Sequence, residues 1–227
     1  MRSQQTGRIG IFITLEGVEG SGKTTQLIRL AKLLREEGYR VVETREPGGT
    51  PLAERIRELL LGSPSSVSLP IKRGHSAETE PMTPECETTL ILAARSQHIA
   101  QVIRPALKES AIVLCDRFSD STLAYQGYAR GLSLKQLRGF NRFVTGGLTP
   151  DLTLLFDLPV EIGLGRRQRD GAEQNRLDRE ASHFHELVRK GFLDLAVRYP
   201  RRIKLIDARR HQDVVAEDVA AIVLKFL

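Results

Sequence analysis

Residues 17–24 carry the most specific chemical signal in this chain. They read Gly-Val-Glu-Gly-Ser-Gly-Lys-Thr, and a second threonine follows at position 25. The spacing matches G-x-x-x-x-G-K-[ST], a loop whose backbone N–H groups surround the phosphates of a nucleoside triphosphate. In such a loop the lysine reaches the outer phosphates, and the last hydroxyl holds Mg²⁺. The predicted phosphate-binding residues are Gly17, Val18, Glu19, Gly20, Ser21, Gly22, Lys23, Thr24 and Thr25.

A carboxylate with a matching role follows a second apolar run. Residues 111–115 read Ala-Ile-Val-Leu-Cys and lead directly into Asp116-Arg117-Phe118. An aspartate at the end of a buried strand holds Mg²⁺, directly or through water, in proteins with this phosphate loop. The plainer alternative is that it caps the next helix. Because the chain carries the loop, we predict that Asp116 and Thr24 form a Mg²⁺ site.

The segments around these motifs alternate between strand and helix patterns. An apolar, β-branched run at 9–15 predicts a buried strand before the loop, and apolar residues at helical spacing up to Gly38 predict a helix after it. Further strands are predicted at 39–44, 111–115, 152–158 and 203–207. Further helices are predicted after Pro51 and at about 84–107, 121–128, 132–144, 177–198 and 214–227. This alternation predicts an α/β fold with a parallel, doubly wound sheet.

Two arginines stand where a ligand or a buried partner is needed. Arg45 directly follows the predicted strand 39–44 and precedes Glu-Pro-Gly-Gly. An arginine at the carboxyl end of a strand points to the crevice where open α/β sheets bind ligands. A solvated arginine in a turn is the alternative. Arg95 lies on a mostly apolar helix, where an arginine needs a ligand or an ion-pair partner. We expect His98 to be packed or solvated rather than catalytic.

Composition limits the class of protein. The 227 residues suit one domain, with a flexible loop at about 62–83 and a basic, flexible cover at about 165–176. Cys86 and Cys115 form no metal or disulfide pattern, the polar N-terminus is not a signal peptide, and no apolar run reaches about 20 residues, so a cytosolic setting is expected.

The net charge of +6 fits nucleic acid or a small anionic ligand. Since there is no tryptophan and no basic block, nucleic acid is disfavoured.

Taken together, these motifs resemble the thymidylate kinase family. The resemblance is carried by Glu16 to Thr25, by Thr44-Arg45-Glu46-Pro47-Gly48-Gly49-Thr50 and by Ala93-Ala94-Arg95-Ser96-Gln97-His98. It continues with Asp116-Arg117-Phe118, Tyr125-Gln126-Gly127 and Pro150-Asp151-Leu152-Thr153. The match covers essentially the whole chain except 62–83.

The resemblance implies a single kinase domain over residues 1–227, with five parallel strands flanked by helices on both faces and a LID segment at about 165–176. It implies phosphorylation of dTMP by Mg·ATP and a homodimer. Glu19 would accept the deoxyribose 3′-hydroxyl near the metal, Arg95 would bond the thymine edge, and Tyr125 would crowd out a ribose 2′-hydroxyl. The substrate-binding residues implied are Glu19, Arg45, Arg95, Arg117, Ser121, Thr122 and Tyr125, of which Arg45 and Arg117 would hold the 5′-phosphate.

This sequence differs from other members of the family at two places. The family has an aromatic ring four residues before the arginine that meets the base, whereas this chain has Ile91. Some members put a basic residue inside the phosphate loop, whereas here the basic residues lie in the LID segment, which resembles the bacterial type. We therefore expect a catalytic arginine among Arg166, Arg167, Arg169 and Arg176. The predicted catalytic residues are Lys23, Glu19, Arg117, Arg167 and Arg176.

Three other functions share single features with this sequence. A GTPase needs Asp-x-x-Gly at a strand end and Asn-Lys-x-Asp, and the sequence has neither. An ATP-dependent nucleic-acid-binding protein is motivated only by the sequence pI of about 9.6. The serious alternative is a related kinase that acts on AMP, UMP or CMP.

Overall fold

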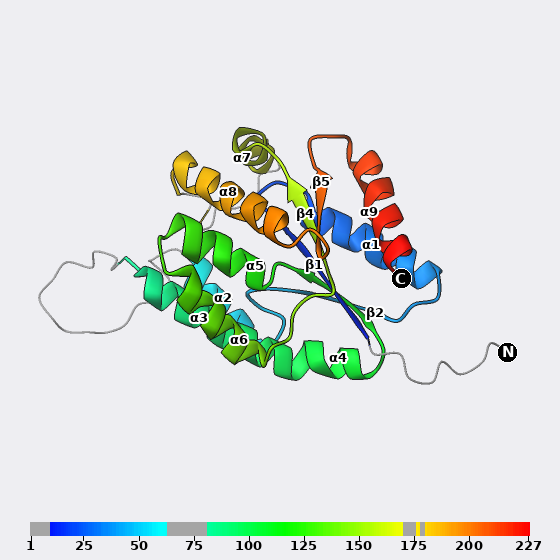
Figure 1. Cartoon of the computed structure of the whole chain (residues 1–227), viewed down its shortest axis with the longest axis horizontal. Coiled ribbons are helices and arrows are strands. Elements are labelled where there is room, and N and C mark those ends of the chain that lie inside the picture. The colour runs from blue at the N-terminus through cyan, green and yellow to red at the C-terminus, as the bar shows by residue number, and fades with distance from the viewer. Residues whose placement is uncertain (1–9, 63–80, 170–175, 178–179) are drawn as a thin grey trace, which may run out of the picture.

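Five parallel strands form one sheet at the centre of the molecule (Figure 1). The computed structural model describes residues 10–62, 81–169, 176–177 and 180–227. The strand order is β2-β3-β1-β4-β5, and every neighbouring pair is parallel. The strands are β1 (Ile11–Gly17), β2 (Val41–Arg45), β3 (Ile112–Asp116), β4 (Leu152–Asp157) and β5 (Ile203–Asp207). All five predicted strands are therefore present.

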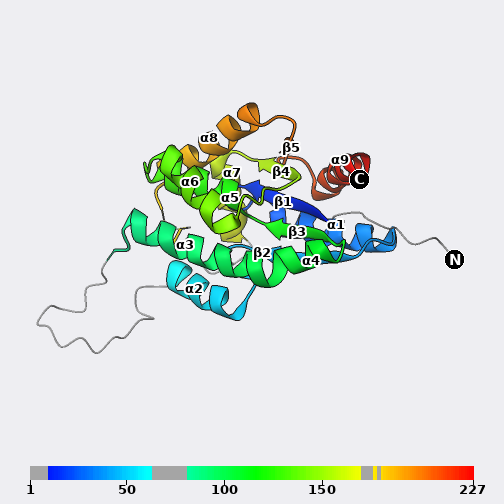
Figure 2. The ribbon, with the colours of Figure 1, turned by 60° about the horizontal axis from the view of Figure 1, so that its bottom comes forward.

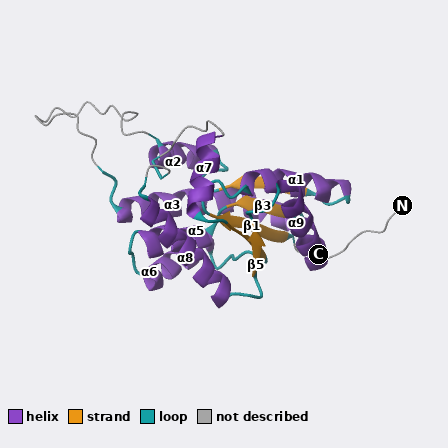
Figure 3. Ribbon diagram, turned by 90° about the horizontal axis from the view of Figure 1, so that it is seen from above, coloured by secondary structure: helices purple, strands orange, loops and turns teal. Residues whose placement is uncertain are grey.

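Helices cover both faces of this sheet. Seen from above, α1 and α9 lie to one side of the strands, and α3, α6 and α8 lie to the other (Figure 3). The α-helices are α1 (Lys23–Glu36), α2 (Pro51–Leu61), α3 (Pro84–His98), α4 (Arg104–Lys108), α5 (Ser119–Thr122), α6 (Leu134–Thr145), α7 (Val160–Arg169), α8 (Ser182–Arg198) and α9 (Gln212–Phe226). Two π-helical segments, η2 (Ile99–Ile103) and η3 (Leu123–Ala129), join them. None of the helices in the described ranges is long and apolar enough to cross a membrane.

The side chains of β1 alternate between two buried clusters, as a strand covered on both faces requires. Ile13 and Leu15 belong to the larger cluster, which includes buried residues of α1 and α9. Phe12 belongs to the smaller one, with Ile99 and Ile103 of η2. Figure 2 shows α8 toward the β4 and β5 side of the sheet and α4 toward the β3 side. Burial on both faces fixes the register in which the strand ends meet.

The predicted helix over 84–107 is divided rather than continuous. It consists of α3, the π-helical segment η2 and α4, with Pro105 in the first turn of α4. Proline has no N–H to donate, and its ring collides with the carbonyl four residues earlier, so a wider turn before it relieves the clash. The predicted helix at 121–128 is likewise divided between α5 and η3.

The segment predicted as a flexible cover is partly helical. Residues 165–169 form the end of α7, and residues 170–175 lie outside the described residues. Two glycines and a run of charged residues make the helical pattern of this segment weak in the sequence. The helix α7 is nevertheless formed, and it packs against the phosphate loop. A Cβ added to Gly163 would lie 2.4 Å from the Glu19 carbonyl oxygen. Of the loop predicted at about 62–83, residues 63–80 also lie outside the described residues.

Candidate functional site

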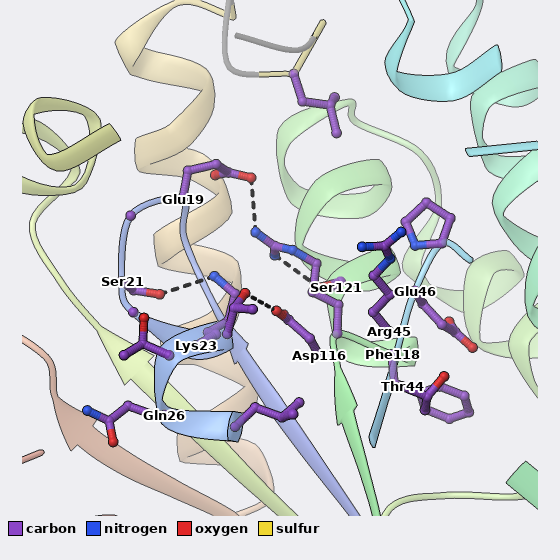
Figure 4. A pocket seen from close by; sticks show the side chains of 18 of the residues that line it. Glu19, Ser21, Lys23, Gln26, Thr44, Arg45, Glu46, Asp116, Phe118 and Ser121 are labelled. Carbon is purple, nitrogen blue, oxygen red and sulfur yellow. Dashed lines mark hydrogen bonds and ion pairs between the residues drawn. The ribbon is translucent and has the colours of Figure 1, made fainter. Parts of the chain in front are cut away.

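A cavity of about 950 Å³ opens at the carboxyl ends of β1, β2 and β3. Lys23 from the start of α1, Asp116 from the end of β3 and Arg45 from the end of β2 all line it (Figure 4). The strand register explains why these side chains lie together, because Arg45 of β2 is paired with Asp116 of β3. Side chains that are far apart in sequence are thus gathered at one edge of the sheet.

The phosphate loop has the backbone that anion binding needs. Gly22 caps α1 in the left-handed conformation, with φ of 85°, which glycine adopts without strain. Gly20 also has a positive φ, and a Cβ there would lie 2.1 Å from the Gly163 carbonyl oxygen. The loop therefore leads into the N-terminus of α1, whose unpaired N–H groups favour an anion.

Lys23 is buried inside this loop. Its Nζ donates to the Val18 carbonyl oxygen at 2.7 Å and to Ser21 Oγ at 3.1 Å. Burial lowers the pKa of Lys23 to about 8, and the nearby Arg117 acts in the same direction. A buried ammonium group beside the loop amides is suited to neutralising phosphate oxygens.

Thr24 and Asp116 lie together, as a Mg²⁺ site requires. Thr24 Oγ1 donates to Asp116 Oδ2 at 2.6 Å, so two hard oxygen ligands are adjacent. The described residues contain no cluster of three or more His, Cys, Asp or Glu suited to a metal. One carboxylate beside one hydroxyl is a ligand pair of the kind through which Mg²⁺ binds together with substrate phosphates.

Glu19, Arg117 and Tyr125 form a buried cluster next to the loop. Glu19 Oε1 accepts from Tyr125 Oη at 2.6 Å and from Arg117 Nη2 at 3.0 Å, and Arg117 lies over the Tyr125 ring. Burial alone would raise the pKa of Glu19, but Arg117 and the other nearby donors outweigh it and hold this pKa well below its usual range. The carboxylate is therefore ionised and available as an acceptor.

Arg117 has a left-handed backbone, with φ of 71°, which is costly for an arginine. A carboxyl group beneath it supports that conformation. Glu16 accepts from the Phe118 N–H at 2.8 Å and from Ser121 Oγ at 2.6 Å. Burial, with the neighbouring Asp120, raises the pKa of Glu16 to about 7. Glu16 thus anchors the turn that directs Arg117 into the cavity.

This raised pKa predicts a pH dependence of stability. The folded protein keeps the Glu16 proton up to about pH 7, whereas an ordinary glutamate loses it near pH 4.5. The stabilising contribution is therefore complete below pH 4.5 and is lost as the pH rises through 7, by about 3 kcal/mol in all. Glu16→Gln, which cannot ionise, should abolish that fall. Urea unfolding of both proteins at pH 5 and pH 8 measures it, and equal changes in the two would contradict the prediction.

Two arginines from β2 and α2 face the same cavity. Arg45 Nη2 donates to Glu54 Oε2 at 3.0 Å. Arg57, which the sequence analysis did not single out, also lines the cavity and donates to the Pro47 carbonyl oxygen at 2.8 Å. Burial, followed by the nearby Arg45, lowers the pKa of Arg57. Two neighbouring guanidinium groups that repel each other favour an anion between them.

Arg95 is the largest side chain that is fully buried among the described residues, with 2% exposure. It donates from Nε to Glu46 at 2.7 Å, from Nη1 to Thr122 and Asn141, and from Nη2 to the Phe118 carbonyl oxygen at 3.0 Å. These bonds use four of its five N–H groups, which leaves one for a ligand. Arg95 nonetheless lines the cavity, with Ile91 one helical turn away.

His98 is packed, as expected. Its ring is fully buried, with Nδ1 3.0 Å from Glu46 Oε1 and Nε2 2.6 Å from Thr44 Oγ1.

The LID arginines separate into two groups. Arg166 and Arg167 from α7 line the cavity. Arg176 lies elsewhere: its Nε donates to the Leu60 carbonyl oxygen at 3.0 Å, and its guanidinium group pairs with buried Glu87. The structure thus places Arg167 on the wall of the cavity and ties Arg176 to α2 and α3.

The other residues predicted for the substrate also meet here. Ser121, Thr122 and Tyr125 line the cavity together with Gln126, and the sequence analysis did not assign Gln126. Gln126 Nε2 donates to Glu87 Oε1 at 2.7 Å. Ala208, directly after β5, and Gln212, the first residue of α9, also line the cavity, and the Gln212 carbonyl oxygen accepts from Gln26 of α1 at 2.7 Å. No motif in the sequence could have marked Ala208 or Gln212.

A parallel α/β sheet, a phosphate loop, a paired threonine and aspartate, and a second basic end of the same cavity define a P-loop nucleotide kinase. A family model described as thymidylate kinase matches residues 15–219. The chain is 52% identical over 213 residues to a protein named thymidylate kinase from Pseudomonas putida (strain GB-1), covering 94% of each. It is 47% identical over 221 residues to a thymidylate kinase of Geobacter sulfurreducens, covering 95% of this chain and 97% of that one.

A solved structure gives the same answer. The crystal structure of thymidylate kinase from Ehrlichia chaffeensis has 33% sequence identity and a TM-score of 0.70, covering 95% of this chain and 99% of that one. The chain belongs to the thymidylate kinase family. The resemblance and the fold class predicted from the sequence are thereby confirmed.

Proposed function

We propose that this chain transfers the γ-phosphoryl group of ATP to dTMP and releases dTDP and ADP. The observation that carries the proposal is one cavity with two cationic ends. Lys23 and the loop amides form one end, Arg45 and Arg57 form the other, and Arg117 lies beside the loop, where it donates to Glu19. Two anions can therefore bind in one cavity, which is the geometry that a transfer between two phosphates needs.

The reaction needs positioning and charge compensation rather than covalent help from the protein. A phosphate oxygen of dTMP attacks the γ-phosphorus, and the bond from that phosphorus to the β,γ-bridging oxygen breaks. ADP leaves with the electron pair of that bond. Lys23 would neutralise the phosphates of ATP, whereas Arg45, Arg57 and Arg117 would hold the phosphate of dTMP.

We propose that Thr24 and Asp116 hold Mg²⁺. The support is the 2.6 Å contact between their oxygen atoms at the mouth of the loop. When bound, Mg²⁺ supplies positive charge to the phosphate oxygens.

The base would occupy the end of the cavity lined by Ile91, Arg95 and Gln126. Arg95 and Gln126 offer polar groups for the thymine edge, and Ile91 offers an aliphatic surface. Tyr125, held by Glu19, would exclude a ribose 2′-hydroxyl. The fully buried pairing of Arg95 with Glu46 makes this end rigid.

Replacing Ile91 with phenylalanine should tighten dTMP binding by up to about tenfold, because ring–ring contact contributes about 0.5–1.5 kcal/mol beyond buried area. Calorimetric titration with dTMP measures the change in Kd, and Ile91→Leu controls for altered volume. Unchanged or weaker binding of the phenylalanine variant would contradict the prediction.

The serious alternative acceptor is another nucleoside monophosphate. ADP formation with dTMP, dUMP, UMP, CMP and AMP, each at the same concentration, decides between them. We expect kcat/KM to be highest for dTMP. A higher kcat/KM for AMP, UMP or CMP would replace the proposed acceptor.

We also propose a homodimer and a cytosolic setting. The dimer rests on the family resemblance, and a partner would cover apolar side chains such as Phe143 of α6, which is 85% exposed. The cytosolic setting is supported by two free cysteines, Cys86 and Cys115. Sedimentation equilibrium tests the dimer.

A further inference from the structure

A buried histidine lies beside the carboxylate of the phosphate loop. His185 of α8 is 1% exposed, and its Nδ1 is 3.4 Å from Glu19 Oε2. Within the described part of the chain, neither nitrogen of the His185 ring has an aligned hydrogen-bond partner, and neither does Glu19 Oε2. Buried polar atoms are rarely left in this condition, so this contact requires an explanation.

The two oxygens of Glu19 are held unequally. Oε1 accepts from Tyr125 and Arg117, whereas Oε2 has no aligned donor among the described residues and lies 3.4 Å from His185 Nδ1. A shift of a few tenths of an ångström would align the Nδ1–H with Oε2 at an ordinary hydrogen-bond length. Such a bond would fix the plane of the carboxylate at both oxygens.

Helix α8 is well placed to carry this contact. Phe184, the residue before His185, packs edge-on against the Tyr125 ring with centroids 6.1 Å apart. Phe192, two turns further along α8, packs against the same ring at 6.2 Å. The helix therefore supports Tyr125, a donor to Oε1, and His185, the neighbour of Oε2.

We propose that His185 is a positioning residue, which donates from Nδ1 to Glu19 Oε2 and orients this carboxylate toward bound dTMP. The proposal rests on the proposed function, because it needs dTMP to bind beside Glu19. A histidine that served only to fill space would be replaceable by an apolar residue without a kinetic effect. An orienting donor would not, since small misplacements of a binding group are costly in rate.

The first experiment compares His185→Leu, which removes the donor, with His185→Asn, which keeps an amide N–H near the position of Nδ1. For His185→Leu, kcat/KM for dTMP should fall by about tenfold, the effect of losing one charge-assisted hydrogen bond, while KM for ATP stays unchanged. His185→Asn should recover most of the loss. His185→Phe is the second apolar variant should His185→Leu fail to fold. Wild-type kinetics in the apolar variant, or no recovery in His185→Asn, would overturn the proposal.

Val188→Ala provides the matched control, because Val188 is fully buried on the same helix, one turn away. It should lower the Tm and leave kcat/KM for dTMP close to wild type. An equal kinetic loss in Val188→Ala would assign the effect to a loosened α8 and overturn the proposal.

A double-mutant cycle with Glu19→Gln tests whether His185 acts through Glu19. The readout is the Kd of dTMP by calorimetry, which does not require turnover. If His185 acts through Glu19, the double variant binds dTMP no more weakly than Glu19→Gln alone. Additive penalties would overturn the inference. Failure of the proposed function would look different, since the wild-type protein itself would not phosphorylate dTMP.

Discussion

Replacing Lys23 with alanine should lower kcat for dTMP phosphorylation by about a thousandfold or more. Loss of one preorganised charge aimed at a transferring group costs roughly 10²–10³ in rate, and cationic groups at a phosphoryl transition state reach about 10³–10⁵. The phosphate loop contains no other cationic side chain, since positions 18–21 are Val, Glu, Gly and Ser. Nothing in the loop can substitute for the missing ammonium group.

Steady-state ADP formation at saturating ATP and dTMP measures this effect. Lys32→Ala is the matched control, because Lys32 lies on the same helix with its side chain 79% exposed. The control should keep the wild-type kcat. Near-normal turnover by Lys23→Ala would remove the phosphate loop from the mechanism.

Replacing Arg167 with alanine should lower kcat by about a hundredfold or more and leave KM for dTMP nearly unchanged. A transferring γ-phosphoryl group spreads negative charge over its equatorial oxygens, and an arginine directed at it can contribute about 10³–10⁵ in rate. Arg167 lines the cavity from α7. The backbone contact between Gly163 and the phosphate loop fixes where α7 sits.

The comparison set is Arg166→Ala, Arg169→Ala and Arg176→Ala. Arg169 is exposed on the same helix, so its variant should retain the wild-type kcat. Arg176 was the other predicted catalytic arginine, and because Glu87 holds it, its variant should lose stability more than kcat. If all four variants keep a near-wild-type kcat, the catalytic arginine lies outside this segment.

The parts of the fold that the sequence predicted are those governed by local patterns. Strands β1, β3 and β4 are mostly apolar runs that end at a turn, so hydrophobic patterning locates them. The phosphate loop is recognisable because its glycines, lysine and threonine must have fixed spacing. Arg95 was expected to need a buried partner, and it has one in Glu46.

The parts that the sequence could not predict depend on contacts between distant segments. Helix α7 has glycines at 163 and 165, which disfavour a helix, and the contact that compensates comes from Gly20. Arg57 lies on an amphipathic helix, where an arginine normally points to solvent. His185 has no local pattern that distinguishes it from an ordinary packed histidine.

The measurement that tests the central claim most directly follows the label from [γ-³²P]ATP in the presence of dTMP and Mg²⁺. We expect the label to appear in dTDP, one for one with the ADP formed, and little of it to be released as inorganic phosphate. Label in inorganic phosphate without labelled dTDP would contradict the account, because the two ends of the cavity would then not hold donor and acceptor for direct transfer.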